Sequence, residues 1–367
     1  MKIIILANSA GGLLSFRQEL LVTLVQKGYE VIVCLPTKDR NKEVEDLGCK
    51  VRIIPIDRRG TNPLKDSKLL MAYINLLRAE KPTAVLTYTI KPNIYGGMAC
   101  RLLRIPYIVN ITGLGSAVES PSTLQKLTLK LYKVALKKAD CIFFQNRGNQ
   151  ELFFQNKINT SAHRLIPGSG ANIDKFHYQS YPTGKRIKFL FISRLMKEKG
   201  IEEYFSAAEY FSKIRSDLEF GILGNCEENY IQRLNSLQEK GIIRYYGVQK
   251  DVRPFIAEAS CLIHPTFYPE GMSNVILEAA STGRPVITTN RHGCMEAVDD
   301  GTTGFLFPQR DTDALIQCIQ RFLDLSYAER EEMGKLGRDK MEKEFNRQIV
   351  IDAYMEEIER ISKKTSI

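Results

Sequence analysis

Short apolar runs alternate with amphipathic stretches along the chain, and this alternation constrains the fold more than any other feature of the sequence. The first unit consists of the apolar run Lys2–Leu6, the helical stretch Ser15–Lys27 that Gly28 ends, and the second apolar run Val31–Leu35. Strands joined through a helix run parallel, because a parallel pair needs a long crossover connection. The sequence therefore predicts an α/β protein built on parallel sheets, with a tight turn at Gly11-Gly12 after the first strand.

The alternation occurs twice, which predicts two doubly wound halves. Residues 167–185 separate the halves, contain several Gly and Pro residues and show no sustained period, as is typical of an interdomain linker. A chain of 367 residues is also longer than a single hydrophobic core usually supports. We expect an N-terminal domain at residues 1–178 and a C-terminal domain at 179–347, with a final amphipathic helix, about 348–367, packing back on the first. Ligands of such sheets bind at the carboxyl ends of strands, so we expect the two domains to face a cleft.

Several common site motifs are absent from the sequence. It has no GxxxxGK[ST], no GxGxxG after the first strand, no GxSxG and no HExxH, which disfavours P-loop enzymes, dinucleotide oxidoreductases, serine hydrolases and zinc proteases. The eight cysteines lack CxxC spacing, and Cys34, Cys141 and Cys261 read as small buried hydrophobes. Asp311-Thr312-Asp313 has the DxD form of a metal site but directly precedes an apolar-periodic run, so we expect Asp311 to cap a helix. The sequence predicts neither a metal nor a cofactor.

The segment from Pro269 to Ala280 carries the strongest candidate site. It follows a predicted strand at 261–264 and opens a helix whose first backbone N–H groups can bind an anion such as a diphosphate. Glu270 precedes the helix and Glu278 lies inside it, so the two carboxylates can grip opposite ends of an elongated ligand. An ordinary capped helix with two surface glutamates is the alternative. Gly271 lets the backbone approach a ligand closely, Met272 follows it, and either Ser273 or Asn274 can cap the helix.

A second strand-to-helix turn carries Arg194 and Lys199. These cations can offset the negative charge that grows on a departing nucleoside diphosphate, which is the work that a metal performs elsewhere. Two solvated basic residues are the alternative.

Together, these residues resemble the family 4 glycosyltransferases, which are retaining enzymes of the GT-B fold. The resemblance covers nearly the whole chain and rests on Gly11-Gly12, Ser193-Arg194, Lys199-Gly200, Pro269-Glu270-Gly271, Glu278-Ala279, Gly283-x-Pro285-Val286 and Gly301-x-x-Gly304 with Pro308 and Asp311. Two further segments are similar to the subgroup that builds lipid-linked glycans and capsules: Thr89-Ile90-Lys91-Pro92-Asn93 and Thr112-Gly113-Leu114-Gly115.

The resemblance implies two Rossmann-like domains and a role for each matched residue. Arg194 and Lys199 would hold the donor diphosphate, Glu270 would contact the donor sugar, and Glu278 would bind the ribose hydroxyls. The backbone of residues 271–274 would support sugar and phosphate. The Gly11-Gly12 loop would lie near the diphosphate and acceptor, and Gly247-Val248 would meet the base. The family needs no metal.

Thr112 departs from the family pattern, because many relatives have a histidine at the matching position. A threonine hydroxyl can donate a hydrogen bond to the donor sugar, but it cannot act as a base near neutral pH. Its presence fits a front-face reaction, in which the departing phosphate accepts the proton of the acceptor.

Positive charge is concentrated in the first half of the chain. Residues 1–180 carry 26 Lys and Arg against 13 Asp and Glu, whereas residues 181–367 carry 26 against 29. Leu124–Lys138 has five lysines and no acidic residue, with an apolar stripe beside the basic face. The stripe either packs on the sheet beneath a solvated basic face, or the helix docks on an anionic membrane. The sequence has no nucleic-acid-binding module and no apolar stretch long enough for a membrane span.

These observations predict a cytoplasmic enzyme that is peripheral on the inner membrane face. It would transfer a hexose or N-acetylhexosamine from a UDP-sugar to a polyprenyl-diphosphate-linked or capsule or O-antigen glycan. A GT-B-like UDP-GlcNAc 2-epimerase and a non-catalytic sugar-nucleotide-binding subunit are the alternatives.

Overall fold

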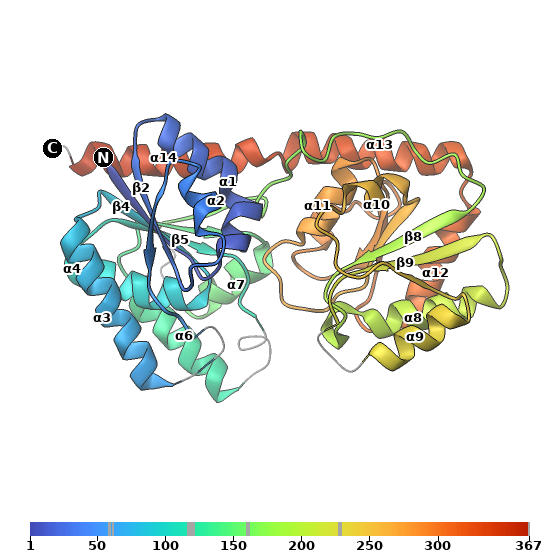
Figure 1. Ribbon diagram of the computed structural model, residues 1–367, viewed down its shortest axis with the longest axis horizontal. Helices are drawn as coiled ribbons and strands as arrows, with labels where there is room; N and C mark the ends of the chain where they lie inside the picture. Colours follow the sequence, from blue (N-terminus) through green and yellow to red (C-terminus); the bar gives the residue numbers. More distant parts are fainter. Residues whose placement is uncertain (58–59, 61, 116–121, 159–161, 227–229, 366–367) are drawn as a thin grey trace. The chain divides into compact units, whose positions relative to one another are not determined.

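The computed structural model describes the chain except residues 58–59, 61, 116–121, 159–161, 227–229 and 366–367 (Figure 1). The chain divides into two compact units. Unit 1 comprises Met1–Ser169, Pro269–Met272 and Gln348–Ile367, and unit 2 comprises Gly170–Tyr268 and Ser273–Arg347. The chain therefore first passes from unit 1 to unit 2 between Ser169 and Gly170. This point lies inside the predicted 167–185 linker and precedes the predicted boundary at residue 178.

Unit 1 contains a parallel sheet that has seven strands in the described residues, in the order β3-β2-β1-β4-β5-β6-β7. These strands are β1 (Lys2–Leu6), β2 (Glu30–Leu35), β3 (Lys50–Ile53), β4 (Ala84–Tyr88), β5 (Tyr107–Ile111), β6 (Cys141–Phe144) and β7 (His163–Leu165). The helices are α1 (Ala10–Gln26), α2 (Asn41–Glu45), α3 (Pro63–Glu80), η1 (Pro92–Gly96), α4 (Gly97–Leu103), α6 (Thr123–Ala135), α7 (Arg147–Gln155) and α14 (Arg347–Thr365).

Both faces of the unit 1 sheet are buried, which explains why its central strands are predominantly apolar. Ile3 and Ile5 of β1 belong to a core with α1 and α14, which contributes Tyr354 and Ile358 among others. Ile4 and Leu6, on the opposite face, belong to a second core with α3, α4 and α6.

Unit 2 repeats the architecture with a parallel sheet of six described strands, in the order β10-β9-β8-β11-β12-β13. The strands are β8 (Ile187–Ile192), β9 (Leu218–Leu223), β10 (Arg244–Tyr245), β11 (Cys261–His264), β12 (Val286–Thr289) and β13 (Gly304–Phe307). The helices are η2 (Lys197–Lys199), α8 (Ile201–Ser212), α9 (Ile231–Glu239), α10 (Arg253–Glu258), α11 (Asn274–Ser281), η3 (Met295–Ala297), α12 (Thr312–Asp324) and α13 (Tyr327–Glu344). The predicted class, two Rossmann-like doubly wound parallel-sheet domains, is confirmed.

The structure contradicts the prediction made for Gly11-Gly12 and confirms the one made for Asp311. The tight turn predicted at Gly11-Gly12 is wrong, because both residues lie in the first turn of α1. Ser9 is extended and its Oγ accepts a hydrogen bond from the Gly12 N–H at 3.3 Å, so the helix begins earlier than its apolar periodicity indicated. The cap predicted at Asp311 is confirmed, since Asp311 Oδ1 accepts from the Ala314 N–H at 2.9 Å.

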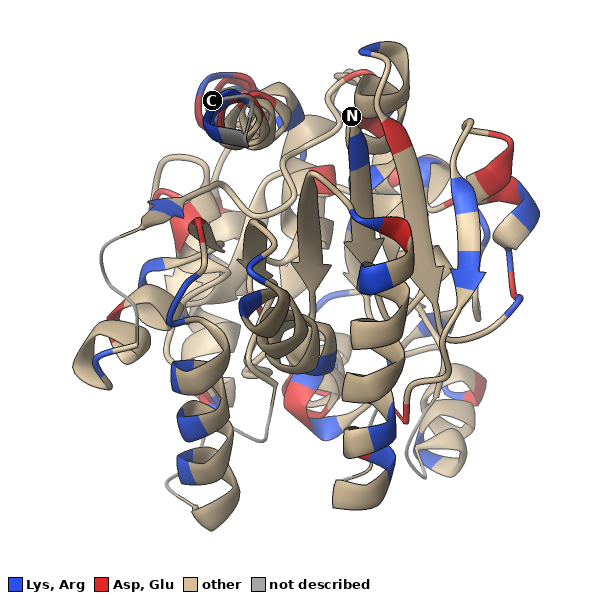
Figure 2. Ribbon diagram, turned by 90° about the vertical axis from the view of Figure 1, so that its left-hand side faces the viewer, with Lys and Arg blue, Asp and Glu red and all other residues tan. Residues whose placement is uncertain are grey.

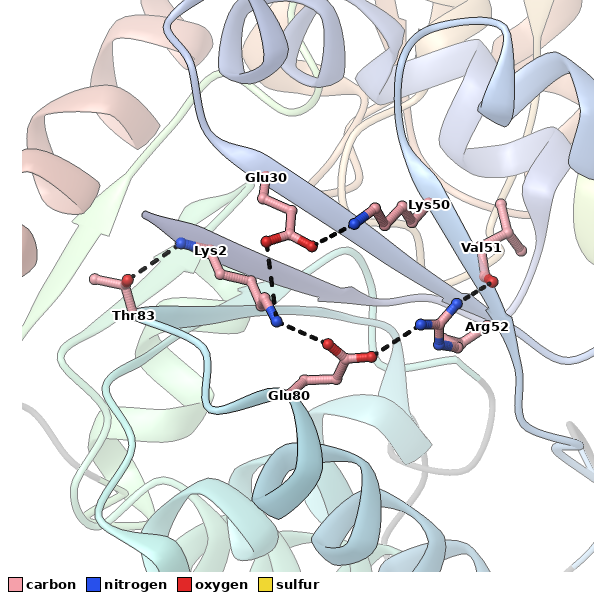
Figure 3. A network of polar contacts seen from close by, with 7 residues as sticks. All are labelled: Lys2, Glu30, Lys50, Val51, Arg52, Glu80 and Thr83. Carbon is pink, nitrogen blue, oxygen red and sulfur yellow. Dashed lines mark hydrogen bonds and ion pairs between the residues drawn. The ribbon is translucent and has the colours of Figure 1, made fainter.

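Strand β3 was not predicted, because its polar side chains interrupt the apolar pattern. It lies at the sheet edge and pairs with β2, with Lys50 beside Ile32 and Arg52 beside Cys34. Figure 3 shows how its charges are held: Lys50 Nζ lies 2.7 Å from Glu30 and Arg52 Nη2 lies 3.0 Å from Glu80. Charged side chains on an edge strand also discourage pairing with another chain.

The cysteines and helices bear on two further expectations. All eight cysteines lie in the described part of the chain as free thiols, and Cys34, Cys141 and Cys261 are buried as predicted. Of the helices that the structure describes, none is both long and apolar enough to cross a membrane.

Candidate active site

The N-terminus of α11 lies at the carboxyl end of β11 in unit 2, as the sequence predicted. Ser273, one of the two predicted caps, occupies the N-cap position, but its hydroxyl makes no cap bond to the helix. Ser273 Oγ lies 2.9 Å from Nε2 of His264, the last residue of β11, while the Ser273 N–H donates to Gly293 O at 2.7 Å. The Ser273 side chain therefore makes no cap bond to α11, and a helix N-terminus favours negative charge.

His264 is a neutral partner for Ser273. It is buried, and burial together with the positive charge of Lys199 holds the pKa of His264 well below its ordinary value. A neutral imidazole fits a buried position near the Lys199 cation, because a second positive charge there would be costly.

Lys199 and Arg194 lie on the turn that follows β8, and both contact the ring of Tyr268. Lys199 Nζ is 4.9 Å and Arg194 Cζ is 5.6 Å from the ring centroid. Lys199 is only 8% exposed, and burial lowers its pKa to about 8, with Arg194 lowering it further and Cys294 opposing. The lysine is therefore a buried cation close to titrating at physiological pH.

Close packing explains why glycine follows Lys199. Gly200 has φ +76°, and a Cβ there would lie 2.1 Å from Pro265 O, just beyond β11. The Phe267 N–H also donates to Glu198 O at 2.9 Å. The turns after β8 and β11 are thus tied together, which brings Lys199 and Arg194 close to the segment that leads to α11.

Glu278 lies one turn after Asn274 on the same face of α11. Burial raises the pKa of Glu278 to about 7, while Lys175 and Arg347 act in the opposite direction. A carboxylate kept at the edge of ionisation inside a structured helix is uncommon, and perturbed acids of this kind concentrate at functional sites.

Glu270, Gly271 and Met272 belong to unit 1, although the chain on either side of them belongs to unit 2. A Cβ on Gly271 would lie 2.5 Å from Thr112 O, so the loop approaches Thr112 through the backbone. Met272 is buried, and a Cβ on Gly168 would lie 2.4 Å from its Cβ. Glycine is therefore required at both contacts.

The remaining predicted residues lie at two other strand ends. Gly11 and Gly12 follow β1 in unit 1, within α1. Gly247 and Val248 follow β10 in unit 2, where Gly247 has φ +69° and its carbonyl accepts from Gly224 N at 2.9 Å. Val248 is 69% exposed, which leaves an apolar side chain available to a flat ligand.

The structure thus gathers Arg194, Lys199 and Ser273 around Tyr268 and His264 in unit 2, and it seats the Glu270 loop on Thr112 in unit 1. Sequence reasoning missed Tyr268 and Asn146. Tyr268 directly precedes Pro269, but a lone tyrosine carries no motif signal. Asn146 stands where a helix N-cap is expected, and that role hides any other. In the described residues, no group of three or more His, Cys, Asp or Glu is placed to hold a metal.

Two family models match the chain. Residues 2–146 match "Glycosyl transferase 4-like" and residues 186–324 match "Glycosyl transferases group 1". Together they cover every described strand except β7 and all of the predicted site residues.

Three relatives named as glycosyltransferases match this chain over most of their length. One is the N,N'-diacetylbacillosaminyl-diphospho-undecaprenol alpha-1,3-N-acetylgalactosaminyltransferase of Campylobacter jejuni, 23% identical over 88% of this chain and 90% of that protein. A second is the UDP-Gal:alpha-D-GlcNAc-diphosphoundecaprenol alpha-1,3-galactosyltransferase of Escherichia coli, 29% identical over 74% of each chain. The capsular polysaccharide biosynthesis glycosyltransferase CapM of Staphylococcus aureus is 25% identical over 81% of this chain and 82% of its own.

Among solved structures, HepE of Anabaena in complex with UDP has a TM-score of 0.81 and 17% sequence identity, covering 98% of this chain and all of that chain. A sucrose-phosphate synthase from Thermosynechococcus elongatus has a TM-score of 0.77 and 20% identity, covering 98% of each chain. These likenesses establish the fold.

Proposed function

Because the chain belongs to the family 4 glycosyltransferases of the GT-B fold, we propose that it transfers a hexose or N-acetylhexosamine from a UDP-sugar to a lipid-linked or capsule glycan, with retention of configuration. The observation that carries the proposal is the pair of cations, Arg194 and Lys199, held on Tyr268 beside the segment that opens α11.

The donor diphosphate would bind in unit 2. Arg194, Lys199 and the first-turn N–H groups of α11 provide positive charge without a metal, and they also stabilise the charge that develops on departing UDP. Glu278 would accept hydrogen bonds from the ribose hydroxyls, and Gly247 with the exposed Val248 would meet the base. UDP is the ligand of the structurally similar HepE complex, which supports the choice of nucleotide.

Glu270 would contact the donor sugar, and retention would follow from a front-face reaction. Thr112 offers no base near neutral pH, and its carbonyl faces Gly271. The oxygen leaving with UDP would accept the proton of the acceptor hydroxyl as the new glycosidic bond forms and the bond to phosphate breaks. No protein base is needed in that scheme.

The acceptor class is proposed from the relatives. Two of them are named as acting on diphospho-undecaprenol-linked sugars and a third as a capsular polysaccharide enzyme. All three are named as glycosyltransferases, which does not favour an epimerase or a non-catalytic subunit.

Helix α6 supports docking on an anionic membrane, at the cytoplasmic face where such an acceptor would be presented. The expected apolar stripe consists of Leu124, Leu127, Leu131, Val134 and Ala135, and only Ala135 and the partly buried Leu131 pack in the unit 1 core. Leu124, Leu127 and Val134 are 41%, 53% and 48% exposed. They lie on the helix that carries Lys126, Lys130 and Lys133, and Figure 2 shows its blue bands on successive turns at the lower left. Exposed leucines among lysines match an interfacial helix better than a solvated one.

The test is a screen of UDP-sugars with polyprenyl-diphosphate-linked acceptors, in which UDP release and the anomeric configuration of the product are measured. We expect turnover that persists in EDTA and falls at least about 100-fold in Arg194→Ala and Glu270→Ala. Full activity in either variant, or an inverted product, would refute the assigned roles. Release of a 2-epimer from UDP-GlcNAc without acceptor would refute the transferase proposal itself.

A further inference from the structure

The loop that carries Glu270 is held by a side chain outside the family motifs. Asn146 follows β6 and is the N-cap of α7, where its Oδ1 accepts from the Asn149 N–H at 2.8 Å. Its Nδ2 donates to Glu270 O at 3.1 Å and also to Gly271 O. The residue is 2% exposed, so one buried amide both caps a helix and binds two successive carbonyls of the loop.

The surroundings of the loop leave it little freedom. A Cβ on Gly271 would lie 2.4 Å from Gln145 Oε1, and a Cβ on Gly113 would lie 3.0 Å from Gly271 N. Gln145 is itself oriented, because its Nε2 donates to Asn110 Oδ1 at 3.1 Å. The Asn110 amide in turn donates to the hydroxyl of Tyr354 on α14. The residues at the ends of β5 and β6 thus form a socket for the loop. Tyr354 of the C-terminal helix α14 supports this socket through its hydrogen bond with Asn110.

The hydrogen bonds within this socket are directional. The close contacts with Thr112, Gly113 and Gln145 limit how near the loop can come, but they do not fix its rotation. The Asn146 Nδ2 donates to the carbonyl oxygens of Glu270 and Gly271, and these hydrogen bonds fix the Glu270–Gly271 and Gly271–Met272 peptide planes, which flank Gly271. The first of these planes adjoins the Glu270 Cα, so its orientation helps to set the direction in which the Glu270 side chain leaves the backbone.

We propose that Asn146 is a positioning residue, whose side-chain amide orients the Glu270–Gly271 backbone and thereby the carboxylate that contacts the donor sugar. This role rests on the proposed function, because the donor sugar is what Glu270 is assigned to bind there. Asn146 acts through Glu270 and does not itself contact the substrate. A displacement of about 1 Å at a reacting group can cost on the order of 100-fold in rate, which sets the scale of the expected effect.

Asn146→Asp separates the two jobs of the side chain. Aspartate is as good an N-cap as asparagine, so the bond to Asn149 is kept. The donor group is replaced by a carboxylate oxygen that faces two carbonyl oxygens. We expect kcat to fall about 100-fold, whereas the affinity for UDP alone changes less than about threefold, because Arg194, Lys199 and Glu278 are untouched. Asn146→Ser also keeps a cap but is too short to reach the carbonyls, and it should reproduce the loss.

Acidification supplies a readout that a merely structural role would not move. A carboxyl buried against two carbonyls titrates above its ordinary range, and its protonated form can donate one hydrogen bond. Activity of Asn146→Asp relative to the unmodified protein should therefore recover as the pH is lowered, whereas Asn146→Ser should show no recovery. The matched control is Asn62→Asp at the N-cap of α3, where Asn62 Oδ1 accepts from Leu64 N at 2.9 Å, and it should leave kcat unchanged.

Hydrogen–deuterium exchange of peptides covering residues 266–276 tests the hydrogen-bonded clamp independently of activity. Faster exchange in Asn146→Asp and Asn146→Ser than in Asn62→Asp is expected, and equal exchange in all three overturns the proposal. Unchanged kcat in both Asn146 variants of an active enzyme also overturns it. If the unmodified protein turns over no UDP-sugar, the proposed function has failed, and exchange still decides whether Asn146 holds the loop.

Discussion

Raising the pH from 7 to 9 should weaken UDP binding about tenfold, because the pKa of about 8 places the loss of the Lys199 charge in this window. Burial lowers that pKa, and a bound diphosphate should raise it again by opposing the positive charge. Binding then requires protonated Lys199. About nine tenths of the molecules carry that proton at pH 7 and about one tenth at pH 9.

Neighbouring groups do not produce the same effect. The pKa of His264 is well below its ordinary value and burial raises the pKa of Cys294 to about 12, so neither titrates between pH 7 and 9. The terminal phosphate of UDP is already largely ionised above pH 7. Glu278, with a pKa of about 7, is half ionised at pH 7, so its further ionisation can strengthen binding by at most about twofold.

Isothermal titration calorimetry with UDP at pH 7, 8 and 9 measures both the affinity and, in buffers of different ionisation enthalpy, the protons taken up. We expect uptake of about half a proton at pH 8, partly offset by Glu278. The matched control is Lys199→Arg, whose guanidinium stays charged over the whole range and whose affinity should not fall with pH. A flat profile for the unmodified protein, or an equal fall in Lys199→Arg, would refute the reasoning.

Two further predictions concern Glu278 and helix α6. The folded-state pKa of Glu278, about 7, lies above its unfolded value of about 4.5, so the folded protein loses stability as the pH rises through that window and carries the full cost above it. Glu278→Gln should therefore be more stable by about 3 kcal/mol at pH 8 and equally stable at pH 4, while binding UDP more weakly; denaturant unfolding that shows no gain at pH 8 would contradict this. Replacing Lys126, Lys130 and Lys133 by glutamate should abolish co-sedimentation with anionic vesicles, since each lysine contributes about 1 kcal/mol. The same charge reversal at the exposed Lys213, Lys240 and Lys343 should not, and equal retention by both variants would exclude α6 as the docking surface.

Local sequence was sufficient where a feature depends on neighbours along the chain. The strand predicted at 261–264 and the helix predicted to open after it agree with β11 and α11, because side-chain periodicity and the glycine that precedes the helix are local signals. The cap at Asp311 is local for the same reason. Strand β3 was not predicted, because its charged residues Lys50 and Arg52 pair with Glu30 and Glu80, which lie on other elements.

The sequence by itself thus determined the parallel α/β class, the family, and which residues are candidates for the donor site. Only the tertiary structure decided the pKa values, the hydrogen-bond partners and the positions of those residues. Burial brought the pKa values of Lys199 and Glu278 near neutrality, and His264 contacts the hydroxyl of Ser273, one of the two predicted caps of α11. The tertiary structure also placed the Glu270 loop in unit 1, where the Asn146 side chain donates a hydrogen bond to Glu270 O. Desolvation and hydrogen-bond geometry depend on which distant segments meet, whereas strand and helix patterns depend on residues a few positions apart.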